Sequence, residues 1–170
     1  MEGAMLIRRT RSDDGQIIRA LRISALTDAP YAFGAKLEDV LGDSPDKFDD
    51  DAFRHSGSDI STSFLAFATA QPVGMIGAFF EQPSRRAFIC SLWIQPSYRG
   101  GVVGRDLLGS AVTWLVERGA NECYAWVADA NVRAIKFYKK LGFLNTGTSQ
   151  ALPSNPSELE HLYCHEIAGR

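Results

Sequence analysis

The sequence predicts an α/β (α+β) protein with a mixed, mostly antiparallel sheet of about seven strands, a parallel pair at its centre and helices on both faces. Three observations support this prediction. Apolar runs joined by short polar links within residues 63–94 are typical of antiparallel strands. A strand, a helix and a further strand at residues 123–127 then follow, an order that forms a right-handed parallel crossover. Apolar residues at helical spacing place helices on either side of these strands.

The N-terminal part combines one short strand with two helices. Residues 6–10 form the strand, and Asp13 caps a helix that must end before Pro30, because a proline disfavours helical geometry in the residue before it. A loop or broken helix at residues 30–42 leads to a second helix, for which Ser44 supplies the N-cap. Three strands are then expected, at residues 63–69, 73–80 and 87–94.

The C-terminal part continues with crossovers. A helix follows Gly104 and is closed by Gly119, since glycine tolerates the left-handed conformation that ends many helices. Residues 146–157 are polar and contain prolines, which predicts a loop. The other elements expected here are a strand at 123–127, a helix at 132–141 and two last strands at 143–144 and 161–167.

Composition narrows the functional classes. A chain of 170 residues is long enough for a single domain, 1–170, with a real core. Its formal net charge of −2 lacks the basic footprint of a nucleic-acid-binding protein. No apolar run reaches the roughly 18 residues of a membrane span, and the three cysteines lack metal-ligand spacing. We therefore expect a cytoplasmic protein that binds no metal, nucleic acid or membrane.

The most informative stretch is residues 94–108, where an apolar strand passes through a glycine-bearing turn into a helix. Gly100 and Gly101 lie in the turn and Gly104 lies at the start of the helix. The first N–H groups of a helix lack partners and lie at the positive end of its dipole. Glycine also lets a ligand approach the backbone closely. The stretch therefore predicts a site for an anion, most naturally a phosphate.

Two motifs together resemble the GNAT superfamily of N-acetyltransferases. Residues 98–108, YRGGVVGRDLL, are similar to the Arg/Gln-x-x-Gly-x-Gly/Ala diphosphate turn of that family. Residues 131–143, NVRAIKFYKKLGF, are similar to its Asn-x-x-Ala-x-x-x-Tyr-x-x-x-Gly-Phe helix. Val102 stands where the family has its first motif glycine, and we expect it to keep a negative φ because valine is strained at positive φ.

The resemblance implies the GNAT (acyl-CoA N-acyltransferase) fold and acetyl-CoA as cosubstrate. The central strand pair is then splayed, and the strand Leu92-Trp93-Ile94 bulges, offering its backbone to the pantetheine arm and an N–H group to an oxyanion. Asn131 either bonds the pantetheine or caps the next helix. Lys140 either reaches a phosphate or lies solvated at a helix end. The other residues implied to bind the cosubstrate are Arg99, Gly100, Gly101, Val102, Val103, Gly104 and Arg105 in the turn, and Ala134, Phe137 and Tyr138 on the second helix.

Tyr138 is the candidate general acid. Coenzyme A leaves as a thiolate, and a thiol has a pKa of about 8.5 whereas a phenol has one of about 10, so a phenol in hydrogen-bond reach can protonate it. Tyr138 can also be a core aromatic. The general base cannot be assigned from the family resemblance, because Trp126 occupies the position of the glutamate that some relatives use as the base. Glu81, at the end of a strand, is our candidate base, with Asp129 or a chain of waters as alternatives.

The acceptor implied by the resemblance is a small-molecule or peptide amine that enters between segments 28–51 and 146–160. The first segment carries eight acidic residues against two lysines. This negative charge either attracts a cationic amine or belongs to a solvated helix face. Tyr31 and Phe33 either line the floor of the acceptor pocket or simply pack. The sequence leaves the oligomeric state open between a monomer and a homodimer, and only family analogy favours the homodimer.

Two other functions compete with an N-acetyltransferase that acts by direct attack in a ternary complex. One is a non-catalytic acyl-CoA-binding sensor of the same fold, against which Tyr138 argues. The other is a dinucleotide-binding oxidoreductase, which would need a Gly-x-Gly-x-x-Gly turn, whereas Arg99 stands at the first glycine position.

Overall fold

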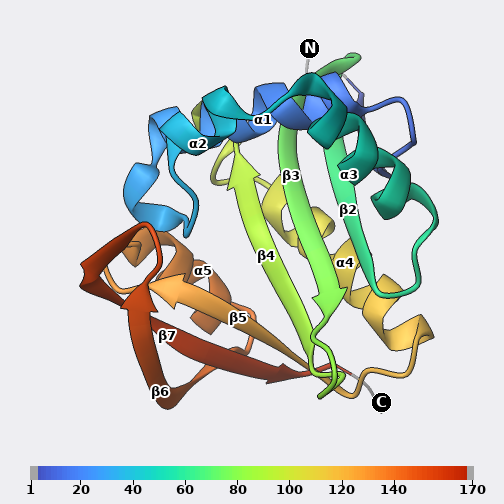
Figure 1. Ribbon diagram of the computed structural model, residues 1–170. Coiled ribbons are helices and arrows are strands. Elements are labelled where there is room, and N and C mark those ends of the chain that lie inside the picture. The colour runs from blue at the N-terminus through green and yellow to red at the C-terminus, as the bar shows by residue number, and fades with distance from the viewer. Residues whose placement is uncertain (1–3, 168–170) are drawn as a thin grey trace.

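One seven-stranded sheet organises the chain (Figure 1). The computed structural model describes residues 4–167. All neighbouring strands are antiparallel except one central pair, which confirms the predicted mixed sheet. In spatial order the strands are β1 (Met5–Arg9), β2 (Ser61–Ala68), β3 (Gln71–Phe80), β4 (Ala87–Ile94), β5 (Glu122–Ala128), β7 (Asn155–Glu166) and β6 (Leu144–Leu152), and β4 and β5 are the parallel pair.

Helices cover both faces of the sheet, as predicted (Figure 1). On one face Leu21 and Phe48 join a core with Leu65 of β2; on the other, Leu107 joins a second core with Ile76 of β3. Residues 30–42 are a broken helical segment, in agreement with the sequence. The first face carries α1 (Gly15–Asp28), η1 (Pro30–Ala32), α2 (Leu37–Gly42) and α3 (Pro45–Gly57); the second carries α4 (Val103–Glu117), which follows η2 (Pro96–Tyr98), and α5 (Val132–Lys140).

The two parallel strands part along most of their length. Within the described chain their register pairs Phe88 with Tyr124 and nothing beyond, and Figure 1 shows β4 and β5 diverging. The partner of β3 shifts from Trp93 to Cys90 over two residues of β3, so β4 carries an extra residue. Ser91 within this bulge has a φ of 55°. The splay and the bulge, both implied by the family resemblance, leave part of the β4 backbone unpaired towards β5.

Two sequence predictions are wrong. Most of residues 146–157 belong to the β6–β7 hairpin rather than to a loop. The edge strand β6 is exposed over almost its whole length, so it has no apolar face that would reveal it in the sequence. The first helix begins one residue later than expected, because the Asp14 carboxylate accepts hydrogen bonds from the Arg11 N–H at 2.7 Å and from Arg8 at 2.6 Å before the helix starts.

Gly109 offers a test of helix α4 that leaves the site untouched. It lies in the middle of this helix, and a Cβ added there would meet nothing within 4 Å. Since glycine destabilises a helix by roughly 0.5–1 kcal/mol relative to alanine, Gly109→Ala should raise the free energy of unfolding by that amount. Thermal unfolding followed by circular dichroism should show Tm higher by about 2–3 °C. A lower Tm would contradict the open surroundings of this residue.

Candidate active site

The turn between β4 and α4 presents a run of free backbone N–H groups. The first hydrogen bond of the helix joins the Asp106 N–H to the Val102 carbonyl at 2.9 Å. The N–H groups of residues 100–105 have no acceptor among the described residues. Gly100, with a φ of 83°, makes the turn, while Val102 has the expected negative φ of −93°. The turn can therefore bind an anion at the positive end of the α4 dipole.

The two arginines of the turn differ in their surroundings. The Arg99 guanidinium donates to the Ile94 carbonyl at 2.9 Å and to the Asp28 carboxylate, which also accepts from the Trp93 indole at 3.0 Å. This cluster joins the end of α1 to the end of β4. Arg105 is exposed in the first turn of α4 and lines a hollow on its outer surface, not the cavity in the gap between β4 and β5. Arg99, and not Arg105, thus lies where a charge can act on a ligand in that gap.

The Asp28 cluster predicts a pH-dependent contribution to stability. The hydrogen bond from Arg99, and then that from Trp93, lowers the pKa of the Asp28 carboxyl. A lowered folded-state pKa stabilises the fold fully above the unfolded value of about 4, and the stabilisation is lost as pH falls through the folded value. Asp28→Asn should lower the free energy of unfolding by about 1 kcal/mol at pH 7, and by less near pH 3.

Urea unfolding at the two pH values measures this difference. Asp50→Asn is the matched control, because Asp50 is exposed and has no ion pair among the described residues. An Asp28→Asn effect of equal size at both pH values would contradict the ion-pair account.

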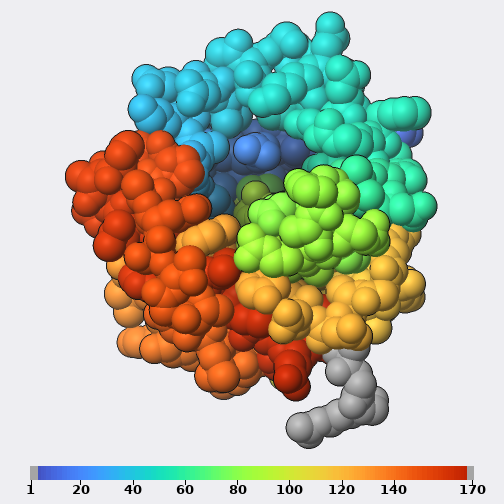
Figure 2. Space-filling view, turned by 60° about the horizontal axis from the view of Figure 1, so that its bottom comes forward, coloured from blue at the N-terminus to red at the C-terminus, as the bar shows by residue number. Residues whose placement is uncertain are grey.

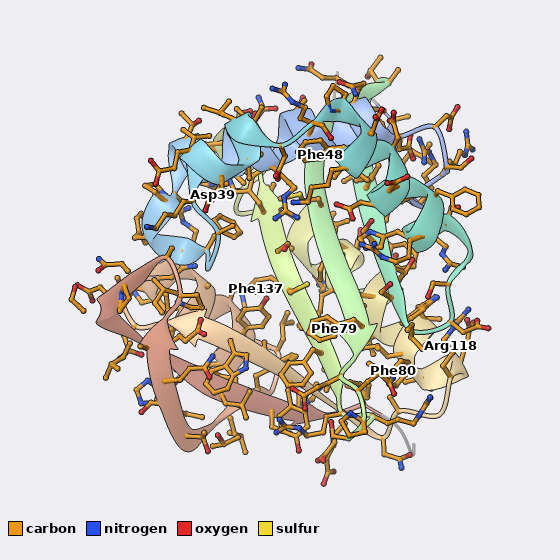
Figure 3. All side chains as sticks on the ribbon, in the orientation of Figure 1. Asp39, Phe48, Phe79, Phe80, Arg118 and Phe137 are labelled. Carbon is orange, nitrogen blue, oxygen red and sulfur yellow. The ribbon has the colours of Figure 1, made fainter. Side chains whose placement is uncertain are left out.

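A cavity of about 310 Å³, here the β4–β5 cavity, fills the gap between the parted strands. Figure 3 shows Phe137 projecting from α5 into this gap. Among the residues predicted to bind the cosubstrate, those that line the cavity are Leu92, Trp93, Ile94, Arg99, Gly100, Asn131, Ala134, Phe137 and Tyr138. Gly101, Val102, Val103, Gly104 and Arg105 continue from its rim into α4, whereas Lys140 lies exposed at the end of α5, away from the cavity.

Asn131 meets both alternatives that the sequence left open. Its Oδ1 accepts from the Ala134 N–H at 3.2 Å, which makes it the N-cap of α5. The same residue lines the β4–β5 cavity. Capping fixes the side chain at the cavity wall, where its amide nitrogen remains available to a ligand.

Tyr138 is a buried aromatic that also reaches the cavity. It is 5% exposed, and its ring packs edge-on against Phe137 and Phe143 at centroid distances of 5.4 and 5.1 Å. Burial, and then the neighbouring Cys90 and Cys123, raises the pKa of its phenol. The hydroxyl has no hydrogen-bond partner among the described residues. It is therefore a neutral proton donor at physiological pH.

A second cavity, here the α1 cavity, has a volume of about 240 Å³ and lies between α1 and the sheet. Figure 2 shows the hollow bordered by the blue and cyan α1–α2 segment, the orange to red β6–β7 hairpin and the green β3–β4 turn. Tyr31 lines the β4–β5 cavity but not the α1 cavity, whereas Phe33 lines both cavities. The two cavities also share Ala32, Ile89, Cys90, Ser91 and Trp126, so they meet at the bulge of β4.

The candidate bases from the sequence lie outside both cavities. Glu81 sits in the β3–β4 turn, where its carboxylate accepts from Ser84 at 2.7 Å and from Arg86 at 3.0 Å. These hydrogen bonds, that of Ser84 first, lower the pKa of Glu81. Asp129 is bound to His161 at 2.6 Å. Neither carboxylate borders the place where the cavities meet, so we do not retain either as a base.

Sequence reasoning missed three residues that line the α1 cavity. Cys90 lies on the cavity floor, where desolvation of its thiol raises the pKa of that group. Arg22 lies on α1, and Glu160 lies on β7 opposite Ala128. The sequence Glu158-Leu159-Glu160-His161-Leu162 does not alternate between apolar and polar residues, so no local pattern places Glu160 facing inwards.

The comparison with known families decides the classification. Residues 13–143 match the model of the acetyltransferase (GNAT) family. The chain belongs to this family. A curated relative is streptothricin acetyltransferase of Streptomyces lavendulae, 29% identical over 169 residues that cover 91% of this chain and 89% of the relative.

Solved GNAT structures share the fold. An acetyltransferase of the GNAT family from Streptococcus pneumoniae matches with a TM-score of 0.81 and 20% identity, over 97% of this chain and 100% of that one. The PaiA N-acetyltransferase of Thermoplasma acidophilum, solved in complex with coenzyme A, matches with a TM-score of 0.76 and 19% identity, over 96% and 99% of the two chains. In residues 4–167 of the GNAT chain described above, no helix combines the length and apolarity of a bilayer span, and no three metal-ligating side chains gather in one place.

Proposed function

We propose that this GNAT protein transfers the acetyl group of acetyl-CoA to a primary amine of a small molecule or peptide. One observation carries the proposal: a turn of free N–H groups opens onto a cavity between parted strands, and this cavity meets a second one at a backbone bulge. Family membership and the similarity to an enzyme named for acetylating streptothricin support acetyl transfer.

The residues of the β4–β5 cavity match the parts of acetyl-CoA. The free N–H groups of residues 100–105 would hold its diphosphate, with Arg99 at the rim. Unpaired backbone of β4 would bond the amides of the pantetheine arm, much as an added strand would, and Asn131 would bond it from the opposite side. The free turn and the open gap both fit this cosubstrate.

The chemistry would take place where the cavities meet. The neutral amine, entering from the α1 cavity, would add to the acetyl carbon to give a tetrahedral oxyanion, and the carbon–sulfur bond would break when this adduct collapses. A backbone N–H of the bulge at Ser91 would stabilise the oxyanion. Tyr138 would give its proton to the leaving thiolate, the amine nitrogen would lose a proton to solvent, and solvent would return a proton to the Tyr138 phenolate. Because both cavities open onto one point, direct attack in a ternary complex needs no covalent enzyme intermediate.

An assay of free thiol release tests the proposal. The protein is mixed with acetyl-CoA and a panel of primary amines, and acetylated products are identified by mass spectrometry. Thiol release that depends on both the protein and an amine is the expected result. Binding of acetyl-CoA by calorimetry, with no release for any amine, would instead identify an acyl-CoA-binding sensor.

A further inference from the structure

The α1 cavity has a distinct charge pattern. Its lining includes one basic and one acidic side chain, Arg22 and Glu160. They come from different elements, α1 and β7. Apolar side chains make up most of the wall between them, including Met75, Phe79, Phe88 and Trp126. The cavity therefore offers one cation and one anion, separated by an apolar surface.

Arg22 has no carboxylate partner of its own. Within residues 4–167 its guanidinium forms neither an ion pair nor a hydrogen bond, whereas Arg8 and Arg99 of the same region are bound to Asp14 and Asp28. Arg22 is also half-buried and lines a neighbouring hollow beside His55. A partly desolvated guanidinium that lacks a carboxylate favours an anionic ligand, which it can bind with two parallel hydrogen bonds.

Glu160 provides the opposite charge. Glu160 is buried, with 7% of its surface exposed, and its Oε1 accepts a hydrogen bond from the Gln150 side-chain amide at 2.6 Å. Oε2 has no partner among the described residues. Glu160 pairs across the sheet with Ala128, two positions from Trp126 on the same face, and Trp126 borders both cavities. A buried carboxylate with a free oxygen favours an ammonium group.

We infer that the acceptor is amphoteric: it carries an anionic group, such as a carboxylate, that binds Arg22, and an amine that is received beside Glu160. Its middle is apolar and packs against Phe33 and Phe79. This inference rests on the proposed function and specifies its substrate class. Polyamines are poor acceptors in this account, because they would bring a second cation against Arg22.

Matched pairs of amines test the inference. Phenylalanine is compared with phenethylamine, and 6-aminohexanoate with pentylamine, since each pair differs by one carboxylate; spermidine represents polycations. The measured quantity is the ratio of kcat/KM within a pair, from thiol release. At least one ratio should favour the carboxylate by about tenfold or more, the size expected of one charged hydrogen-bonded contact.

Substitutions in α1 test whether Arg22 causes the preference for the carboxylate, measured as the ratio of kcat/KM within a pair. Arg22→Gln should lower the ratio by about tenfold, and Arg22→Lys, which keeps the charge, should retain most of it. Arg19→Gln, on the same helix but outside both cavities, is the control and should leave the ratio unchanged. Glu160→Gln should raise KM for every amine.

Four results would overturn the inference. Turnover of spermidine alone, or a ratio at or below one in both pairs, would refute an amphoteric acceptor while leaving the transferase intact. A ratio that is unaffected in Arg22→Gln would remove Arg22 from recognition. Absence of thiol release with every amine, despite bound acetyl-CoA, would contradict the proposed function itself.

Discussion

Replacing Tyr138 by phenylalanine is expected to lower kcat by at least about 10²-fold, while the Kd for acetyl-CoA changes by less than about twofold. The substitution removes the hydroxyl but keeps the ring that packs against Phe137 and Phe143. Because burial raises the pKa of this phenol, the wild-type hydroxyl stays protonated. Its ionisation should therefore produce no fall in kcat below about pH 10.

Steady-state kinetics and calorimetry measure the two effects separately. Tyr124→Phe is the matched control, because the Tyr124 hydroxyl donates to Glu122 at 2.8 Å, outside both cavities. Unchanged kcat in Tyr138→Phe would leave Tyr138 a packing residue only. A loss of acetyl-CoA affinity equal to the loss of activity would instead mean that the hydroxyl positions the cosubstrate.

Gly104→Val is expected to weaken acetyl-CoA binding by about 10–100-fold. A Cβ added at Gly104 would meet Ile94 Cδ1 at 2.9 Å and Phe137 Cε2 at 3.2 Å. Both neighbours line the β4–β5 cavity, and a branched side chain would push them apart and displace the N–H groups of the turn. The Kd from calorimetry is the direct measurement.

Gly109→Val is the control for this substitution. It places the same side chain in the same helix, where nothing lies within 4 Å of the added Cβ. The control should bind acetyl-CoA like the wild type. Equal Kd values for Gly104→Val and the control, with far-UV circular dichroism spectra unchanged, would show that close contact at Gly104 does not shape the binding site.

The central part of the fold was predictable from local sequence features. Apolar runs reveal β2 to β5 because these strands are buried, and Gly100 and Gly104 reveal the turn because their positions demand close contact or positive φ. The edge strand β6 was predicted only at its start, Leu144, because the exposed polar residues that follow carry no alternation. The local sequence pattern therefore identifies strands that are buried in the core, but it does not identify a strand whose side chains are exposed to solvent.

Several residues that line the β4–β5 cavity were predictable from the sequence, but the charged residues of the α1 cavity were not. Asn131 and Tyr138 occupy motif positions whose spacing fixes them on α5 beside the gap. The surroundings of Arg99 depend on Asp28, which is 71 residues away, and no local pattern shows that pairing. Glu160 likewise reaches the α1 cavity only through the β5–β7 ladder. Residues that long-range contacts bring to a cavity stay hidden in a single sequence.

Amide hydrogen exchange, followed by NMR with and without saturating coenzyme A, tests the central claim most directly. The N–H groups of residues 100–105 lack acceptors in the free protein and should exchange rapidly. Coenzyme A should slow their exchange markedly, together with that of β4 amides facing the gap, and leave the β1–β2 pair unchanged. Continued rapid exchange at residues 100–105, while calorimetry shows coenzyme A bound, would contradict the diphosphate site and the account built on it.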